Sequence, residues 1–309
     1  MSREEEEMDL EVDIQNPFGC CQCDGVPVDL FASESEHMPC YLSLHSDDLR
    51  LRIRRSALSL IYQSKFSYDL DPFLVYLAAN YVDRFLSKQE IREERSWIAH
   101  ILVLASLSLA AKMRKFDLSD LLSDLQREVG LEFDSQSVQR METILLASLQ
   151  WRMRSITPFS FLQYFVSLLE LEDAAQCVKN RACDIIFNVQ HELKLLQYKP
   201  STVAASALVC AIQDLNKSDG FSSSEATICS SEYVNKQTLL ECFTVMQKAA
   251  RDDNEQTGNG TPGPTDIRRT NSRTREEGIE RDNVEERRRR RLNGVCDDRT
   301  FQISQVQYC

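Results

Sequence analysis

The fold of this chain is decided by one apolar stretch, Trp97-Ile98-Ala99-His100-Ile101-Leu102-Val103-Leu104-Ala105-Ser106-Leu107-Ser108-Leu109-Ala110-Ala111, which is followed at once by Lys112-Met113-Arg114-Lys115. At 100° per residue its apolar side chains point in almost every direction, so a helix here must be covered on all sides. A membrane span needs about 20 apolar residues. This run is shorter and contains His100 and two serines, so we expect the central helix of a soluble bundle.

The composition favours an all-α protein. The chain has 309 residues, of which 42% are apolar, and this is enough to build substantial cores. Glycine and proline, the two residues that break helices, occur only 9 and 8 times, mostly outside the apolar stretches.

The charge is unevenly distributed along the chain. The net charge is -12, with eleven Asp or Glu against the single Arg3 in residues 1–45, whereas residues 268–291 contain ten Arg. Segments this rich in one sign of charge are poor core formers. We therefore expect a disordered acidic head over residues 1–45 and a disordered tail with a basic run over residues 251–309.

Helix start signals divide the middle of the chain into two bundles. Ser46-Asp47-Asp48 is suitable capping chemistry for a first helix ending near Tyr62, with Arg50, Arg52, Arg54 and Arg55 on a basic surface, and Asp71-Pro72 starts the next helix. The signal recurs at Thr157-Pro158, where a second bundle begins. The first bundle, residues 46–154, is expected to contain helices over 49–62, 72–85, 97–111, 118–129 and 138–149. The second, residues 155–250, is expected to contain helices over 159–169, 174–195, 200–215 and 236–250.

No catalytic signature is present in the sequence. There is no Gly-rich phosphate loop, His191-Glu192 lacks the second His of a metalloprotease helix, and the four His residues form no metal constellation. The sequence therefore predicts a protein that is not an enzyme and that holds no metal or cofactor.

Glu142 is the most informative anomaly. On a helical wheel it falls in the middle of an apolar stripe made by Val138, Leu145 and Leu149. A buried, unpaired carboxylate costs several kcal/mol, so Glu142 needs a partner, and Lys112 at the exit of the central helix is the natural candidate. The alternative is that Glu142 reaches the bundle edge while Lys112 only complements the C-terminus of its own helix.

Four stretches make the sequence recognisable. These are Leu77-Ala78-Ala79-Asn80-Tyr81-Val82-Asp83-Arg84-Phe85-Leu86-Ser87, Leu109-Ala110-Ala111-Lys112, Gln139-Arg140-Met141-Glu142 and Ile156-Thr157-Pro158-Phe159-Ser160-Phe161-Leu162. Over about residues 45–250 the chain closely resembles a cyclin, specifically a plant D-type cyclin. The resemblance implies two tandem five-helix cyclin boxes. It also implies the regulatory subunit of a cyclin-dependent kinase, which activates the kinase to promote the G1/S transition and cell division in plants.

The resemblance also implies which residues bind the kinase. The family's Lys and Glu at the positions of Lys112 and Glu142 pair with each other and bond to the kinase near its regulatory helix, which places a glutamate against the lysine of the ATP site. Four further residues match positions of apolar contact with the kinase, although each could instead be a core residue: Met113, Leu146, Trp151 and Met153.

The sequence departs from the family at two places. The substrate-docking patch usually reads Met-Arg-x-x-Leu followed by Trp, and the matching residues here are Ile53, Arg54, Ala57 and Leu60. The patch is thus degenerate and recruitment of Arg-x-Leu substrates is doubtful. The head also lacks Leu-x-Cys-x-Glu, so binding of retinoblastoma-related protein is doubtful, and the chain resembles the plant D-type subgroup without this motif. Kinase inhibitors are a further class of partner.

The basic run Arg287, Arg288, Arg289, Arg290 and Arg291 suits an acidic import-receptor groove, so we expect a nuclear protein with a cytoplasmic share. A solvated low-complexity tail and contact with nucleic acid are the alternatives. For the whole chain, the competing functions are a transcription-factor-like nucleic-acid or protein binding module with the same tandem boxes, and a plain scaffold. The acidic net charge and the lack of zinc-ribbon ligands argue against direct nucleic-acid binding. No membrane association is expected.

Overall fold

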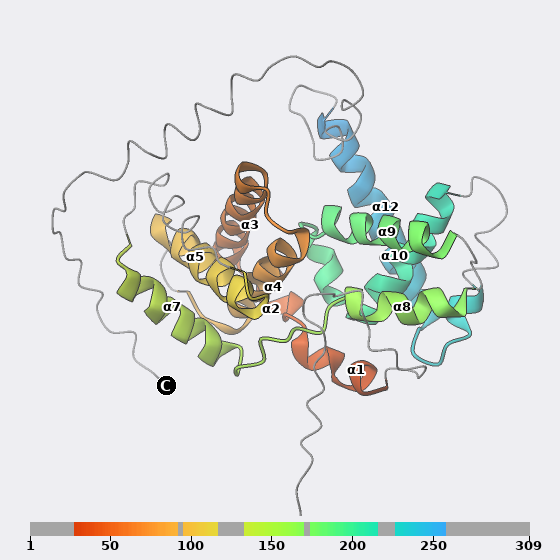
Figure 1. Cartoon of the computed structure of the whole chain (residues 1–309), viewed down its shortest axis with the longest axis horizontal. Helices are drawn as coiled ribbons and strands as arrows, with labels where there is room; N and C mark the ends of the chain where they lie inside the picture. The colour runs from red at the N-terminus through yellow and green to blue at the C-terminus, as the bar shows by residue number, and fades with distance from the viewer. Residues whose placement is uncertain (1–27, 92–94, 117–132, 170–173, 216–225, 258–309) are drawn as a thin grey trace, which may run out of the picture. The chain divides into compact units, whose positions relative to one another are not determined.

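A computed structural model describes residues 28–91, 95–116, 133–169, 174–215 and 226–257, and every regular element within these ranges is a helix (Figure 1). The prediction of an all-α fold is confirmed for this part of the chain. The first bundle contains α3 (Asp48–Tyr68), α4 (Pro72–Lys88), α5 (Ser96–Met113) and α7 (Ser135–Ser148). The second contains α8 (Phe159–Leu168), α9 (Ala175–Asn188), the 3-10 helix η3 (Leu193–Gln197), α10 (Pro200–Leu215) and α12 (Lys236–Thr257).

One fully covered helix lies at the centre of each bundle. Helix α5 packs against α3, α4 and α7, and its residues 101–111 are all buried. Helix α10 packs against α8, α9 and α12, and its residues 200–212 are all buried. The central position of α5 was predicted from its apolar residues on every side, and a small-residue-rich helix was predicted over residues 200–215. None of the described helices combines the length and the apolar character that crossing a bilayer requires.

Three helices begin at aspartate caps, as predicted for Asp47 and Asp71, whereas α8 begins after Pro158 without a side-chain cap. The Asp71 carboxylate accepts a hydrogen bond from the Phe73 amide, with Pro72 in the first helical turn, and Asp134 accepts one from the Ser137 amide. Asp47 caps α3 in the same way. The predicted helix over residues 118–129 lies outside the described residues.

Regular structure begins earlier than predicted. The segment before α3 forms α1 (Val28–Ser33), the 3-10 helix η1 (Glu34–His37) and α2 (Tyr41–His45), so the prediction of a disordered head was wrong for residues 28–45. Phe31 is buried in the second core and stacks on Tyr233 with ring centroids 4.0 Å apart. Leu44 is fully buried in the first core. Residues 28–45, which we call the N-terminal strap, therefore contact both bundles.

Several predicted helix ends were also wrong. Helix α4 ends at Lys88 instead of Phe85, and α12 runs to Thr257 instead of Ala250, so the prediction of a disordered tail was wrong for residues 251–257. Helix α3 continues past Tyr62 to Tyr68 and is ended by Asp69, whose φ of 49° is left-handed. Helix α9 ends at Asn188 instead of continuing to Leu195. The chain turns after α9, and the backbone carbonyls of Gln190 and His191 in this turn accept hydrogen bonds from Arg54 of the first bundle.

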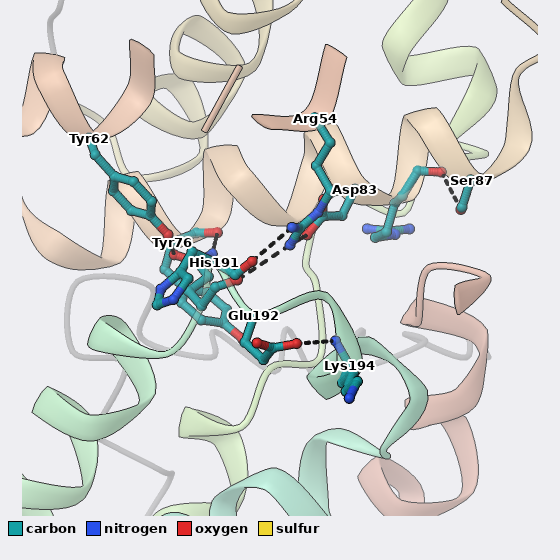
Figure 2. Close-up of polar contacts among 10 residues, drawn as sticks. Arg54, Tyr62, Tyr76, Asp83, Ser87, His191, Glu192 and Lys194 are labelled. Atoms are coloured by element: carbon teal, nitrogen blue, oxygen red, sulfur yellow. Dashed lines mark hydrogen bonds and ion pairs between the residues drawn. The ribbon is translucent and has the colours of Figure 1, made fainter. Parts of the chain in front are cut away.

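Arg54 joins the two bundles (Figure 2). Its Nε lies 2.7 Å from Oδ1 of Asp83, and its Nη2 lies 3.2 Å from Oδ2. Its Nη1 donates to the carbonyl of His191 at 2.8 Å, and Nη2 donates to that of Gln190 at 3.4 Å. Arg54 is 3% exposed, so its assignment to a basic surface was wrong.

The surroundings of Arg54 exclude water. Burial raises the pKa of Asp83, while the charge and hydrogen bonds of Arg54 oppose that rise. Gln190 donates to the Tyr76 carbonyl at 2.9 Å, and the rings of Phe73 and Tyr76 pack edge-on against Phe159 of α8. Loss of the buried Arg54 guanidinium is expected to be costly, because the hydrogen-bond acceptors that it contacts would lose their donor.

Helices α5 and α7 end in the same backbone motif. The amide of Phe116 donates to the Ala111 carbonyl at 2.8 Å, and the amide of Trp151 donates to the Leu146 carbonyl at 2.9 Å. These are the six-residue hydrogen bonds of a Schellman cap, which requires a left-handed residue just after the helix. Lys115 (φ 53°) and Gln150 (φ 55°) fill that position although neither is glycine, and Trp151 itself has φ 60°.

We predict that Arg54→Ala lowers the free energy of unfolding by about 3–5 kcal/mol, because it leaves the Asp83 carboxylate buried without its partner. Asp83→Ala should also be destabilising, and the double variant should cost less than the sum of the two single changes. Urea unfolding followed by circular dichroism measures all three. The matched control is Arg181→Ala, which removes one side of the exposed Arg181–Asp214 pair and should cost at most about 1 kcal/mol. Equal costs for Arg54→Ala and Arg181→Ala would contradict the role given to Arg54.

We further predict that Gln150→Gly stabilises the chain by about 0.5–1 kcal/mol, because glycine adopts the left-handed conformation without a Cβ clash. Thermal unfolding measures the change. Gln139→Gly, within the regular part of α7, is the control and should destabilise by about 0.5–1 kcal/mol. A loss of stability in both variants would mean that the backbone at Gln150 is not strained.

Candidate functional site

Lys112 and Glu142 form an ion pair where α5 and α7 meet. Nζ of Lys112 lies 2.6 Å from Oε2 and 2.8 Å from Oε1 of Glu142, so the ammonium bridges both oxygens. The Lys112 side chain is 60% exposed, whereas that of Glu142 is only 11% exposed. The predicted pairing is confirmed. The alternative that Glu142 avoids burial by reaching the bundle edge is excluded, because Glu142 is a buried residue.

The pair retains hydrogen-bonding capacity toward solvent. An ammonium has three donors and a carboxylate has about four acceptor positions, and their mutual contact uses only part of both sets. Since the Lys112 head is exposed, the remaining donor is available to a partner. The pair can therefore bind backbone groups of another protein.

Trp151 projects from the protein directly after α7. It is 70% exposed, although a tryptophan normally buries most of its ring. Its position is fixed on the following side as well, because the Tyr81 hydroxyl donates to the Met153 carbonyl at 2.7 Å and Arg84 Nη1 donates to the Arg152 carbonyl at 3.0 Å. An exposed aromatic ring on a backbone held in this way is preorganised for binding.

The other predicted apolar contact residues differ in accessibility. Met113 and Leu146 are half-buried and flank the first core, so both present part of their side chains to the surface. Met153 is 7% exposed and belongs to the core, which is the alternative that the sequence left open. The structure brings Met113, Leu146 and Trp151 to the surface near the ends of α5 and α7.

Sequence reasoning missed Phe116. This ring is 54% exposed and occupies the same place after α5 that Trp151 occupies after α7. A Schellman cap usually places an apolar contact between this position and the last helical turn, but both aromatic rings remain largely open to solvent. The signal in the sequence was the aromatic residue directly after Lys112-Met113-Arg114-Lys115. Ile144, on the outward face of α7, is also exposed and was not assigned.

The degenerate docking patch is mostly inaccessible in this structure. Ile53 and Ala57 are buried, Leu60 is half-buried, and Arg54 is committed to Asp83 and the second bundle. These four residues therefore offer no accessible site for an Arg-x-Leu peptide, whose binding the sequence had already made doubtful. Arg287–Arg291 and residues 1–27 lie outside the described residues. Within the described ranges, no group of three or more His, Cys, Asp or Glu could hold a metal ion.

Comparison with known proteins agrees with this architecture. The model of the cyclin N-terminal domain matches residues 29–154, and the model of the cyclin C-terminal domain matches residues 156–261. The first match begins within the N-terminal strap.

Curated relatives cover most of the chain. It is 41% identical over 231 residues to putative cyclin-D6-1 of Arabidopsis thaliana, covering 72% of this chain and 75% of the relative. It is 36% identical over 256 residues to cyclin-D6-1 of Oryza sativa subsp. japonica, covering 79% of this chain and 76% of that relative. Among solved structures, a viral cyclin from herpesvirus saimiri matches with a TM-score of 0.53 over 65% of this chain and 85% of that chain, and at 16% identity this likeness shows the fold alone.

The tandem helical bundles, the Lys112–Glu142 pair and these relatives agree with one another. The chain belongs to the cyclin family, and its relatives place it among the plant D-type cyclins.

Proposed function

We propose that this chain is the regulatory subunit of a cyclin-dependent kinase and that it activates the kinase without contributing a catalytic group. The observation that carries the proposal is the Lys112–Glu142 pair, in which a buried carboxylate orients an ammonium that is 60% exposed. A buried carboxylate in an apolar stripe costs stability, so a purely structural role gives a poor account of it. A binding role accounts for both its burial and its exposed partner.

The surface around the pair suits a protein partner. Trp151 and Phe116 supply large apolar areas at two helix ends, and buried aromatic anchors dominate the energetics of protein interfaces. Met113 and Leu146 would add apolar contact between the two aromatic rings and the Lys112–Glu142 pair. The kinase would gain a positioned regulatory helix, with its glutamate against the ATP-site lysine, and catalysis would remain the kinase's own.

The finer features of the proposal follow from the family. We place the action of the complex at the G1/S transition in plant cells, where D-type cyclins promote division. Kinase inhibitors would be further partners of the complex. Retinoblastoma-related protein is not expected to bind through residues 1–45, because they lack Leu-x-Cys-x-Glu.

We predict that Glu142→Ala weakens binding to a plant cyclin-dependent kinase by about thirtyfold or more, because removing one partner of a hydrogen-bonded charge pair costs roughly 2 kcal/mol or more at an interface. Trp151→Ala should also weaken binding while leaving thermal stability nearly unchanged, since the ring is mostly exposed. Calorimetric titration of the kinase with full-length cyclin measures the affinity, and phosphorylation of histone H1 measures activation.

Asp214→Ala is the matched control. It removes a carboxylate that forms an ion pair with Arg181 on the second bundle, so it changes the charge equally without touching α5 or α7. Its kinase affinity should equal that of the wild type. If Glu142→Ala retained wild-type affinity and helical circular dichroism, the ion pair would not be part of the kinase interface.

We also propose that Arg287–Arg291 directs nuclear import, with a share of the protein in the cytoplasm. Five adjacent guanidinium groups suit an acidic receptor groove. Replacing the five arginines by glutamine should reduce nuclear accumulation of a fluorescent fusion too large for passive entry, while kinase affinity stays unchanged. A variant that is as nuclear as the wild type would show that entry depends on another signal or on the kinase.

A further inference from the structure

A group of basic side chains gathers where the N-terminal strap, the end of α4 and the segment after α7 meet. We call Arg84, Lys88, Arg152 and His37 the basic cluster. Arg84 and Lys88 lie one helical turn apart on α4, and Arg84 donates to the backbone carbonyl of Arg152 at 3.0 Å. Arg152 in turn forms an ion pair with Glu36, the residue next to His37 in the strap.

Arg84 is an unusual residue in this cluster. Its side chain is among the largest that are fully buried, and the residue is only 1% exposed. Nη1 donates to the Arg152 carbonyl and to the Ser155 hydroxyl, at 3.0 and 2.8 Å, but Nε and Nη2 have no hydrogen-bond partner. Nδ1 of His37 is likewise buried without a partner.

The charges in the cluster are not balanced. Arg84, Lys88 and Arg152 are three cations, and within the part of the chain that the structure describes Glu36 forms an ion pair with Arg152, so these four groups together carry a net charge of about +2 with His37 neutral. Buried charges are normally paired, since an isolated charge in a low-dielectric interior is costly. Arg54 illustrates the normal case in this molecule, because its charge is matched by Asp83.

The cluster perturbs its own members. The pKa of His37 is lowered by burial and then by the charges of Arg84 and Arg152, and Glu36 opposes this. The pKa of Lys88 is lowered by burial and by the same two arginines. Burial is the larger cause of both shifts, and repulsion between neighbouring cations lowers the two pKa values further.

We propose that the basic cluster is a binding site for a phosphate monoester, carried by a phosphorylated serine or threonine of a partner protein. Arg152 and Lys88 are exposed and would contact the phosphate oxygens directly. Arg84 would act from beneath, as a buried positive charge whose field is weakly screened. Such a phosphate carries a charge of about -1.5 to -2 at neutral pH, which matches the excess in the cluster, whereas a single carboxylate does not.

Glu36 has a specific part in this proposal. Its carboxylate already occupies Arg152, so it is an internal competitor that a phosphate must displace. The side chains of both residues are about half exposed, which allows the exchange without unfolding. A protein-borne phosphate is favoured over a free ion because Arg152 directly follows Trp151, so a segment of a protein bound at that ring could also reach the cluster.

The test is a titration of the full-length protein, without kinase, with inorganic phosphate and with O-phosphoserine, followed by ³¹P NMR at constant ionic strength. We expect saturable binding of both probes, about tenfold weaker in Arg152→Gln because a charge-assisted hydrogen bond is lost. Glu36→Gln should bind more tightly than the wild type. The imidazole resonances of His37 should report a higher pKa when phosphate is bound, because a nearby anion favours the imidazolium.

Two control variants separate the site from general charge effects. Arg181→Gln and Asp214→Asn change the net charge by the same amounts as Arg152→Gln and Glu36→Gln, but on an exposed pair of the second bundle, and both should bind phosphate like the wild type. Phosphate affinities that follow net charge alone would overturn the proposal. Binding of inorganic phosphate without binding of O-phosphoserine would overturn the protein-borne source.

Discussion

The contact between the two bundles of this cyclin is centred on the buried guanidinium of Arg54. Arg54 reaches from α3 to Asp83 on α4 and to two backbone carbonyls after α9, so it sets the spacing within the first bundle and the contact with the second. Its planar fork suits this task, because five donors in fixed directions can satisfy acceptors on two chain segments at once. A lysine could not replace it, since its compact ammonium lacks that geometry.

The same residue shows what sequence reasoning can and cannot resolve. Helices α5 and α10 were predictable because apolar residues on all faces indicate burial whatever surrounds them. The pairing of Lys112 with Glu142 was predictable because a carboxylate in an apolar stripe needs a cation. The burial of Arg54 was not, because its acceptors include the carbonyls of Gln190 and His191, more than 130 positions away, and backbone groups carry no signal in the sequence.

The N-terminal strap was missed for a related reason. Its acidic composition is typical of a solvated segment, yet one of its acids, Glu34, is 1% exposed and accepts hydrogen bonds from the amide and hydroxyl of Ser201, both at 2.9 Å. That carboxylate sits at the start of α10, where the helix dipole and unpaired amides favour an anion. The composition of a segment gives the number of its charged side chains, but it does not show which of them have buried hydrogen-bond partners.

The ends of α5 and α7 combine strain with exposure. Left-handed lysine and glutamine cost more than glycine would, and the aromatic residues that follow are left in solvent, so neither choice serves the stability of the isolated chain. Both choices occur on the two helices that the Lys112–Glu142 ion pair joins. Both helices thus end with a left-handed residue that is not glycine, followed by an exposed aromatic ring. A binding role shared by the two helix ends explains both features.

The N-terminal strap also constrains the order in which the chain can fold. It is synthesised before both bundles, but Ser201, the partner of Glu34, follows 167 positions later, and Phe31 stacks on Tyr233, which lies further on still. Contacts at this separation form late, because a long loop must close before they gain anything. Phe31 of the strap therefore stays exposed to solvent until the second bundle has been synthesised. Phe31 can pack only after the second bundle has formed. A polypeptide released before that point would expose this ring to chaperones and proteases.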